Sequence, residues 1–564
     1  MILRVLRLIR AYFAIIVVAG TFSWAALIIF SRRAEETPPG TITLRIGHWQ
    51  LETGVRDAFK QMAQDYQKIN PKVRVVQDAI PETTYGQWVT TQLMGGTAPD
   101  LMELAMHLPY NIWLSYYNRY IIPLTQYVNT PNPYNQGTEL EGVPLRHTFK
   151  DGMRVAYVDE MQEYIGMPLS QFGVRVFYNK DLLKKLTGLD QAPQNYQEFL
   201  AVCEKIKQQK DAQGRHYVPI ACSKYHMSSW DSMMFDPITY PAIQYADFNR
   251  DGFVGNDELY VAVRTGRINF DFPGFRAKFQ LLREMSDYFQ TGYTGVLRDE
   301  AVFLIAQGRA VFMSTGTWDL RSLQQQAEGR FEVGVMDFPR PGKDDPYFGD
   351  LAENLTYEKA PGGFMFGITR TSKHPDVALD FLLFLAGQKQ DEKMNRIIGW
   401  IPSVIGTSMD PLLEEFQPNL EGAYSAWNPH LGGETTIKYV QLYSLFQVRQ
   451  ISYDELLAEF EPFYKEQGYK DFMEQQKDWR RGMHNNERFL AGIRAKALLS
   501  EGEKALSGWV KYRTLTAARQ VWPEIGHNRQ MRLIHDGPDL KAVGPYEYST
   551  EVLQQIRQRI GSPT

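Results

Sequence analysis

The sequence predicts an α/β fold with parallel strands, divided into more than one folded unit. Residues 42–46 alternate apolar and polar side chains, residues 55–69 repeat apolar side chains at helical spacing, and residues 73–76 form a second apolar run. A strand, a helix and a strand at such short spacing are typical of a parallel sheet. The chain has 564 residues, which is too long for one hydrophobic core, so we expect at least two domains.

Composition and charge exclude several classes of protein. Hydrophobic residues make up 44% and charged residues 22% of the chain, as in ordinary globular proteins, and the formal net charge is -4. No stripe of Lys and Arg with interleaved aromatic residues is present, which argues against nucleic-acid binding. The only cysteines are Cys203 and Cys222. They could pair in an oxidising compartment, but both fall in apolar runs, so the pattern favours buried free thiols.

The N-terminus carries an export signal. Arg4, Arg7 and Arg10 precede residues 11–30, which contain no charged side chain, and Arg32 follows them. About 20 apolar residues span a bilayer, whereas the apolar region of a cleaved signal has about 7–15. We therefore expect an uncleaved signal-anchor helix, with a cleaved signal as the alternative. In both cases the bulk of the chain is exported, to the periplasm or the cell surface, and residues 1–10 of an anchored chain stay cytoplasmic.

After a linker that ends at Gly40, the first strand finishes at His48 and Trp49. A helix is expected over residues 87–94, followed by a turn and a short strand that ends at Glu103. Ligands of parallel sheets tend to lie at the carboxyl ends of strands. His48, Trp49 and Glu103 are therefore candidate ligand-binding residues.

Residues 164–181 form an extended stretch around Pro168 that ends in Asn179-Lys180-Asp181 and a helical pattern. One interpretation is a segment that crosses between two folded units. The other is an ordinary core strand with an edge proline.

Residues 247–258 match the twelve-residue calcium loop. Oxygen-bearing residues occupy positions one, three and five, a glycine occupies position six, and a glutamate occupies position twelve. The expected ligands are Asp247, Asn249, Asp251, the Phe253 carbonyl and Glu258. We expect a single structural loop and not a paired sensor hand, because Tyr240-Pro241 interrupts any long entering helix.

Several motifs appear in the order found in one known family. They are Gly96-Thr97-Ala98-Pro99-Asp100, Tyr178-Asn179-Lys180-Asp181, Gly308-Arg309-Ala310 before Gly316-Thr317-Trp318, and Gly362-Gly363-Phe364. In these motifs the chain resembles extracytoplasmic solute-binding proteins of ABC importers, in the group that carries maltose and other oligosaccharides. The resemblance covers roughly residues 42–460 and says little about the ligand.

The resemblance implies a type II periplasmic-binding-protein-like fold, with two α/β lobes that close on a solute. Lobe one would comprise residues 41–169 and 316–361, and lobe two residues 173–315 and 366–464. The chain would cross between them at residues 167–172, 312–316 and 362–368. Each crossing contains residue types that tolerate a change of backbone angle, and the expected hinge residues are Pro168, Ser170, Ser314, Gly316 and Gly363.

A sugar presents flat C–H faces and hydroxyl edges, so its site needs aromatic platforms flanked by carboxylates, amides or Arg. Each candidate Trp could equally be a core residue. The candidates are His48, Trp49, Glu103, Trp230, Asp231, Trp318, Asp319 and Trp400, the last because the family's turn of this type borders the cleft.

The resemblance implies a binding protein that delivers a carbohydrate-like solute to an ABC permease. The alternative is a ligand-sensing module for a membrane signalling partner. No short catalytic motif is present, so we expect no enzyme, although a calcium-dependent polysaccharide-degrading enzyme is a third candidate. By analogy alone, a calcium site in the family suggests uronate-containing ligands.

Residues 465–564 have no counterpart in the simplest family members. Phe489, Leu490 and Ile493 form a helical apolar stripe within them, and Lys and Arg outnumber Asp and Glu. We expect a helical extension that packs on a lobe, or that docks a partner such as the permease.

Overall fold

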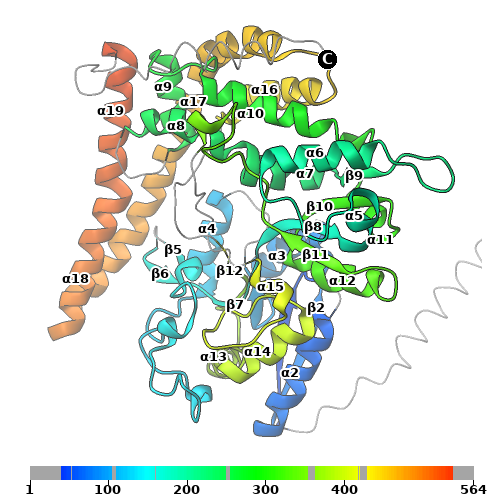
Figure 1. Cartoon of the computed structure of the whole chain (residues 1–564). Coiled ribbons are helices and arrows are strands. Elements are labelled where there is room, and N and C mark those ends of the chain that lie inside the picture. The colour runs from blue at the N-terminus through cyan, green and yellow to red at the C-terminus, as the bar shows by residue number, and fades with distance from the viewer. Residues whose placement is uncertain are drawn as a thin grey trace, which may run out of the picture.

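The computed structural model describes residues 40–51, 54–104, 110–158, 161–248, 254–352, 362–416, 418 and 429–537. Two sheets, each flanked by helices, lie one above the other, and a long helical hairpin runs along one edge (Figure 1). Within the described ranges, no helix has the length and apolar character needed to cross a membrane. The expected anchor, residues 11–30, lies outside those ranges.

Lobe one is built on a six-stranded sheet with the order β2-β1-β3-β12-β4, and β7 also pairs with β12. Its strands are β1 (Ile42–His48), β2 (Val73–Ala79), β3 (Leu101–Glu103), β4 (Ile121–Ile122), β7 (Met167–Gln171) and β12 (Gly362–Thr369). As the sequence predicts, β1 is parallel to β2 and β3. β12 is antiparallel to its neighbours.

Five helices flank the sheet of lobe one, and α2 buries the face that its sequence periodicity predicts. The helices are α2 (Val55–Ile69), α3 (Glu82–Gly95), α4 (Tyr110–Tyr120), α13 (Pro375–Leu385) and α14 (Gln388–Ile398). In α2, Val55, Ala58, Phe59, Met62 and Tyr66 are all buried. A small hairpin of β5 (Tyr157–Val158) and β6 (Glu163–Tyr164) adds to the same core.

Lobe two has a four-stranded sheet with the order β11-β8-β10-β9. The strands are β8 (Val174–Asn179), β9 (Val218–Ala221), β10 (Ala310–Gly316) and β11 (Val333–Met336). Its helices are α5 (Lys180–Thr187), α6 (Tyr196–Lys207), α7 (Lys224–Trp230), α8 (Tyr240–Ile243), α9 (Asn256–Arg264), α10 (Pro273–Ser286), α11 (Arg298–Ala306), α12 (Thr317–Ala327), α15 (Pro411–Glu414) and α16 (Gly433–Gln447).

Two segments belong to the opposite lobe from the one that the sequence predicts. β11 pairs with β8, and Leu320 and Leu323 of α12 pack in a lobe-two cluster, so residues 317–336 lie in lobe two. β12 pairs with β3, and α13 and α14 pack on the same core, so residues 362–398 lie in lobe one. The prediction was wrong here because sheet membership depends on pairing with strands far away in the sequence.

The hinge predictions are correspondingly revised. Pro168 and Ser170 lie inside β7, and the chain passes to lobe two just after it, at residues 172–173. Ser314 and Gly316 lie in β10, so the expected second crossing is wrong. Gly363 pairs with Ser170 in the lobe-one sheet, beside the first crossing.

The chain returns from lobe one to lobe two after α14. The Gln171 backbone N–H donates to the Ile401 carbonyl (2.8 Å), and Phe416 is buried in a lobe-two cluster. This crossing therefore lies directly against the first one. The passage in the other direction, before β12, falls on residues 353–361, outside the described ranges.

The C-terminal part is helical, as predicted. Helix α17 (Tyr453–Leu498) is followed by α18 (Gly502–Thr516), a π-helical turn η9 (Ala517–Val521) and α19 (Trp522–Asp536). Phe460, Tyr464 and Phe472 of α17 are buried in the lobe-two core. The extension is therefore continuous with lobe two and does not begin as a separate unit at residue 465.

The two cysteines are free and buried, as the sequence favours. Burial raises the pKa of both thiols well above the usual value. They offer no reactive thiolate to a modifying reagent.

Candidate functional site

A chain of aromatic rings runs through the junction between the two lobes. Trp318, at the start of α12, lies against Phe172 of the first crossing, with ring centroids 5.9 Å apart. Phe172 contacts Trp400 at 4.9 Å, and Trp400 contacts Phe364 of β12 at 5.1 Å. Phe59 of α2 continues the chain, since it lies 5.3 Å from Phe364 and 5.2 Å from His48. Three of the predicted residues, His48, Trp318 and Trp400, are thus joined by ring contacts.

A polar network lies at the carboxyl ends of β1 and β3. One Glu103 carboxylate oxygen accepts a hydrogen bond from the Trp49 backbone N–H (3.2 Å), and the other accepts from the Gln50 amide (2.6 Å). The Tyr85 hydroxyl donates to the Glu103 carbonyl (2.9 Å), and its ring lies 4.9 Å from that of Trp49. The predicted pair Trp49 and Glu103 therefore meets in space.

His48 is fully buried and neutral at physiological pH. Burial lowers its pKa to about 4, and its Nε2 lies 3.3 Å from the Gln77 amide oxygen. Its Nδ1 has no hydrogen-bond partner among the described residues. His48 thus packs against Phe59 in the lobe-one core and presents no open ring face.

Trp318 and Asp319 differ in exposure and role. Trp318 is partly buried, and its indole Nε1 has no hydrogen-bond partner in the described ranges. Asp319 accepts from the Arg298 guanidinium (2.5 Å) and from the Thr315 hydroxyl (2.6 Å). Asp319 therefore fixes the first turn of α12, which carries Trp318.

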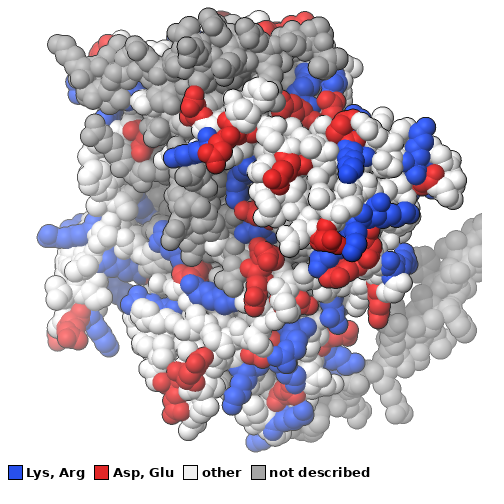
Figure 2. All heavy atoms as spheres, in the orientation of Figure 1, with Lys and Arg blue, Asp and Glu red and all other residues white. Residues whose placement is uncertain are grey.

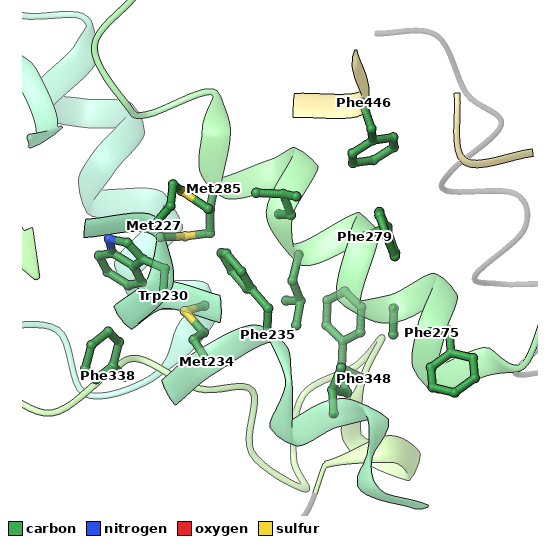
Figure 3. Close-up of a cluster of buried hydrophobic side chains, with 14 of the residues drawn as sticks. Met227, Trp230, Met234, Phe235, Phe275, Phe279, Met285, Phe338, Phe348 and Phe446 are labelled. Atoms are coloured by element: carbon green, nitrogen blue, oxygen red, sulfur yellow. The ribbon is translucent and has the colours of Figure 1, made fainter. Parts of the chain in front are cut away.

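Trp230 and Asp231 lie away from the junction. Trp230 is fully buried in the lobe-two core, where its ring centroid is 5.1 Å from that of Phe338 (Figure 3). Asp231 accepts from the Tyr443 hydroxyl (2.6 Å), and burial raises its pKa. The buried position of Trp230 differs from the stacking platform that we expected, because methionine and phenylalanine side chains from distant segments close over the indole.

Trp400 is also only 1% exposed, so it forms a wall of the junction between the lobes.

Three residues at the junction were not anticipated from the sequence. Gln50 could have been, because it follows Trp49 directly at the end of a strand. The sequence hinted at Phe172 more weakly, because it stands next to a glycine in an extended stretch. Tyr85 lies at ordinary core spacing in α3, and nothing in the sequence separates it from a packing residue.

The predicted calcium loop is only partly described. Asn249, Asp251 and Phe253 lie outside the described residues. Both carboxylate oxygens of Glu258 accept backbone hydrogen bonds, from Phe248 (3.1 Å) and Gly255 (3.3 Å). In the part of the chain that is described, no group of three His, Cys, Asp or Glu side chains is placed to hold a metal ion. Through its bond from Gly255, Glu258 thus caps the start of α9, and calcium binding by this loop stays a prediction.

Two α/β lobes, linked by adjacent crossings with aromatic and carboxylate side chains at their junction, define a two-lobe solute-binding protein. The family model described as bacterial extracellular solute-binding protein matches residues 61–412, and the chain belongs to this family.

Similar curated proteins include two that are named as binding proteins. The multiple sugar-binding protein of Streptococcus mutans is 20% identical over 356 residues, which cover 62% of this chain and 73% of that protein. An uncharacterized ABC transporter extracellular-binding protein of Pyrococcus horikoshii is 21% identical over 380 residues, covering 65% and 73%.

Solved structures share the fold at low identity. One comes from work on xylan utilization by Caldanaerobius polysaccharolyticus, with a TM-score of 0.53, 19% identity, and coverage of 75% of this chain and 99% of that one. A chitin oligosaccharide binding protein gives a TM-score of 0.52, 15% identity, and coverage of 76% and 98%. The fold is therefore shared with these proteins, one of which is named for binding chitin oligosaccharides.

Proposed function

We propose that this protein captures a carbohydrate-like solute between its lobes and delivers it to an ABC permease. The observation that carries the proposal is the ring chain that joins Trp318 in lobe two to His48 in lobe one, in a chain of the extracellular solute-binding family. Two similar proteins are named for binding sugars or chitin oligosaccharides, which favours a carbohydrate.

Trp49 and Trp318 are the proposed stacking residues, because both are only partly buried and they belong to different lobes. A sugar ring placed against one indole would leave its hydroxyl edges for polar groups such as Glu103 and Gln50. The closed form would be favoured only by a solute that touches both lobes, since only such a solute binds the closed state more tightly. Phe172, in ring contact with both Trp318 and Trp400, would line the junction beside the bound solute.

A thermal-shift screen over neutral and uronate oligosaccharides tests the ligand class. A bound sugar should raise the unfolding midpoint by mass action. Trp318→Ala should then weaken the measured affinity by roughly tenfold or more, because an aromatic face is lost. Phe303→Ala is the matched control, since Phe303 is a 57% exposed aromatic residue of α11. The carbohydrate proposal fails if no sugar shifts the midpoint, or if both variants lose affinity equally.

Ligand sensing for a membrane signalling partner is the second candidate, since the same fold would serve it. A solute-dependent rise in ATP hydrolysis by a reconstituted transporter would support delivery. Binding of the loaded protein to a sensor ectodomain, with no such rise, would favour sensing.

We propose calcium as a structural ion of residues 247–258. Exhaustive chelation with EDTA should lower the unfolding midpoint of the wild-type protein, and added Ca²⁺ should restore it. Glu258→Gln, which removes the charge but keeps the shape, should abolish the response to both reagents. An unchanged midpoint after chelation would show that the loop holds no ion.

We also propose that residues 11–30 anchor the chain in the membrane, with lobes outside the cytoplasm. Their uncharged length and the preceding arginines support this topology. N-terminal sequencing of protein recovered from membranes tests it, because a cleaved signal would yield a chain that begins beyond residue 30.

A further inference from the structure

One long helix forms an edge of the molecule. α18, η9 and α19 follow one another without interruption from Gly502 to Asp536, along the hairpin at one side of Figure 1. The inner face packs on α17. Leu515 is fully buried, the Arg519 guanidinium lies 4.6 Å from the Phe489 ring centroid, and a Cβ at Gly508 would lie 2.9 Å from that of Ala497.

The outer face of this helix carries large apolar side chains that nothing in the described ranges covers. Their exposed fractions are high: Leu506 66%, Val510 57%, Val521 48%, Trp522 67% and Ile525 51%. Leu498 and Leu499 at the preceding turn are 62% and 88% exposed. Scattered exposed leucines are ordinary, but a row of this kind over roughly 30 Å of helix marks an interaction surface.

The π-helical turn keeps the row on one side. Leu506 and Val510 are four residues apart and so share a face of α18. η9 adds the equivalent of one residue to the helical turn, which brings Ile525 of α19 back to that face, with Trp522 at its border, where it also lines a hollow beside Gln475 of α17. Without the π-helical turn, the two halves of the row would point in different directions.

Basic side chains lie among these apolar residues. Residues 502–536 contain six Lys or Arg and three Asp or Glu, a net charge of +3 in a chain whose formal net charge is -4. Arg513, Arg529 and Arg532 are exposed on the same helix. Figure 2 shows Lys and Arg side chains projecting from the edge where α18 lies. Positive charge is thus concentrated on the element that also exposes apolar side chains.

We propose that the outer face of α18, η9 and α19 lies on a lipid bilayer that carries anionic headgroups. Apolar side chains with Trp, interleaved with Arg and Lys, are the composition of helices that lie in the plane of a membrane interface. The apolar side chains enter the acyl boundary, and the guanidinium groups bind phosphate oxygens. A second copy of the chain is a poorer occupant, because it would bring a second helix of net charge +3 against the first.

The inference goes beyond solute binding, since it requires no solute. It also differs from anchoring by residues 11–30, because the contact is made by a folded helix more than 450 residues further along the chain. Its consequence is a fixed orientation of the two lobes relative to the bilayer.

The test places a polarity-sensitive fluorophore on Leu506→Cys in the full chain, held in lipid nanodiscs. Labelling is specific because Cys203 and Cys222 are fully buried. The readout is local, so tethering by residues 11–30 does not affect its meaning. With phosphatidylglycerol in the disc, emission should shift to the blue and a lipid-linked quencher should reduce it. The same label on Leu189→Cys, a 42% exposed site on lobe two, should show neither effect.

Charge variants test whether contact with anionic headgroups causes the fluorescence change at position 506. Arg513→Gln with Arg529→Gln should reduce the fraction of labelled helix at the lipid by roughly tenfold or more. Lys185→Gln with Lys224→Gln changes the net charge equally on lobe two and should leave it unchanged.

Three results would overturn the inference. The first is unchanged emission at position 506 in anionic discs, and the second is an equal response at position 189. The third is a shift that follows protein concentration in the absence of lipid, which would identify a second copy as the occupant.

Discussion

Asp391 of α14 joins the two crossings between the lobes. Its carboxylate accepts from the Val404 backbone N–H (3.1 Å) and from the Asn395 amide (3.2 Å). Asn395 in turn donates to the Leu169 carbonyl of β7 (2.9 Å) and accepts from the Ser170 hydroxyl (2.6 Å). One buried carboxylate thus positions both the strand before the first crossing and the segment that leads into the second.

The burial of Asp391 makes stability depend on pH. Desolvation raises its pKa to about 7, against about 4 in an unfolded chain. The folded protein therefore holds this proton where the unfolded chain has released it. The stabilisation is complete below about pH 4 and is lost as the pH rises through about 7, at a cost of at most about 4 kcal/mol.

Asp391→Asn should remove this component, because the amide stays neutral at every pH and keeps one acceptor oxygen. Urea unfolding at about pH 5 and about pH 8 tests this. The difference in unfolding free energy between the two pH values should be smaller in the variant than in the wild type. An identical difference in both proteins would assign the pH dependence to other groups.

Gly173 lets the two crossings touch. A Cβ at this position would lie 2.4 Å from the Phe416 carbonyl oxygen, closer than any real contact. Gly173→Ala should therefore push the segments apart and lower the unfolding free energy by about 1–3 kcal/mol. Gly295→Ala is the control, since its Cβ would meet nothing within 4 Å. Equal unfolding free energies in the two variants would contradict the close approach.

At the scale of the element, the C-terminal hairpin bridges the lobes. α17 is buried in the lobe-two core, whereas Lys511 of α18 forms an ion pair with Glu163 of β6 in lobe one. Glu163 also accepts a hydrogen bond from the Thr125 hydroxyl, which fixes its carboxylate. The hairpin therefore spans the lobe junction on the outside.

Lys511→Met should loosen this bridge with little effect on global stability. The Lys511 and Glu163 side chains are 32% and 16% exposed, so the pair contributes less than about 1 kcal/mol to unfolding. Amide hydrogen exchange should rise in residues 161–164 and 502–512. Lys504→Met, on the same helix, controls for loss of charge. Unchanged exchange in Lys511→Met would show that the hairpin is held without the ion pair.

At the scale of the molecule, the core of lobe two is complete only when α17 has packed against it. Phe460 is 2% exposed, and its ring lies 5.3 Å from those of Phe270 and Tyr439. Phe460→Ala should lower the unfolding free energy by about 3–5 kcal/mol, because it leaves a cavity between α16, α17 and the turn that carries Phe270. Val448→Ala, at a 48% exposed site, should change it little. A small effect of Phe460→Ala in denaturant titrations would mean that lobe two folds without this helix.

The sequence alone was enough to predict the local structure of α2 and the family to which the chain belongs. The spacing of Val55, Phe59 and Met62 predicted the buried face of α2, and the order of the motifs predicted two α/β lobes. It could not assign β11 and β12 to their lobes, because a short apolar strand fits either sheet. It also could not separate Trp230 from Trp318, since the packing around each indole comes from distant segments. The solute contacts themselves stay predictions.

The position of β12 in its sheet has a consequence for the order of synthesis. This strand lies between β3 and β4, so lobe one keeps an open sheet edge until residue 369 has been made. The core of lobe two likewise stays incomplete until α17 has been made. An emerging chain therefore cannot complete either lobe until the strands and helices of its second half have been made.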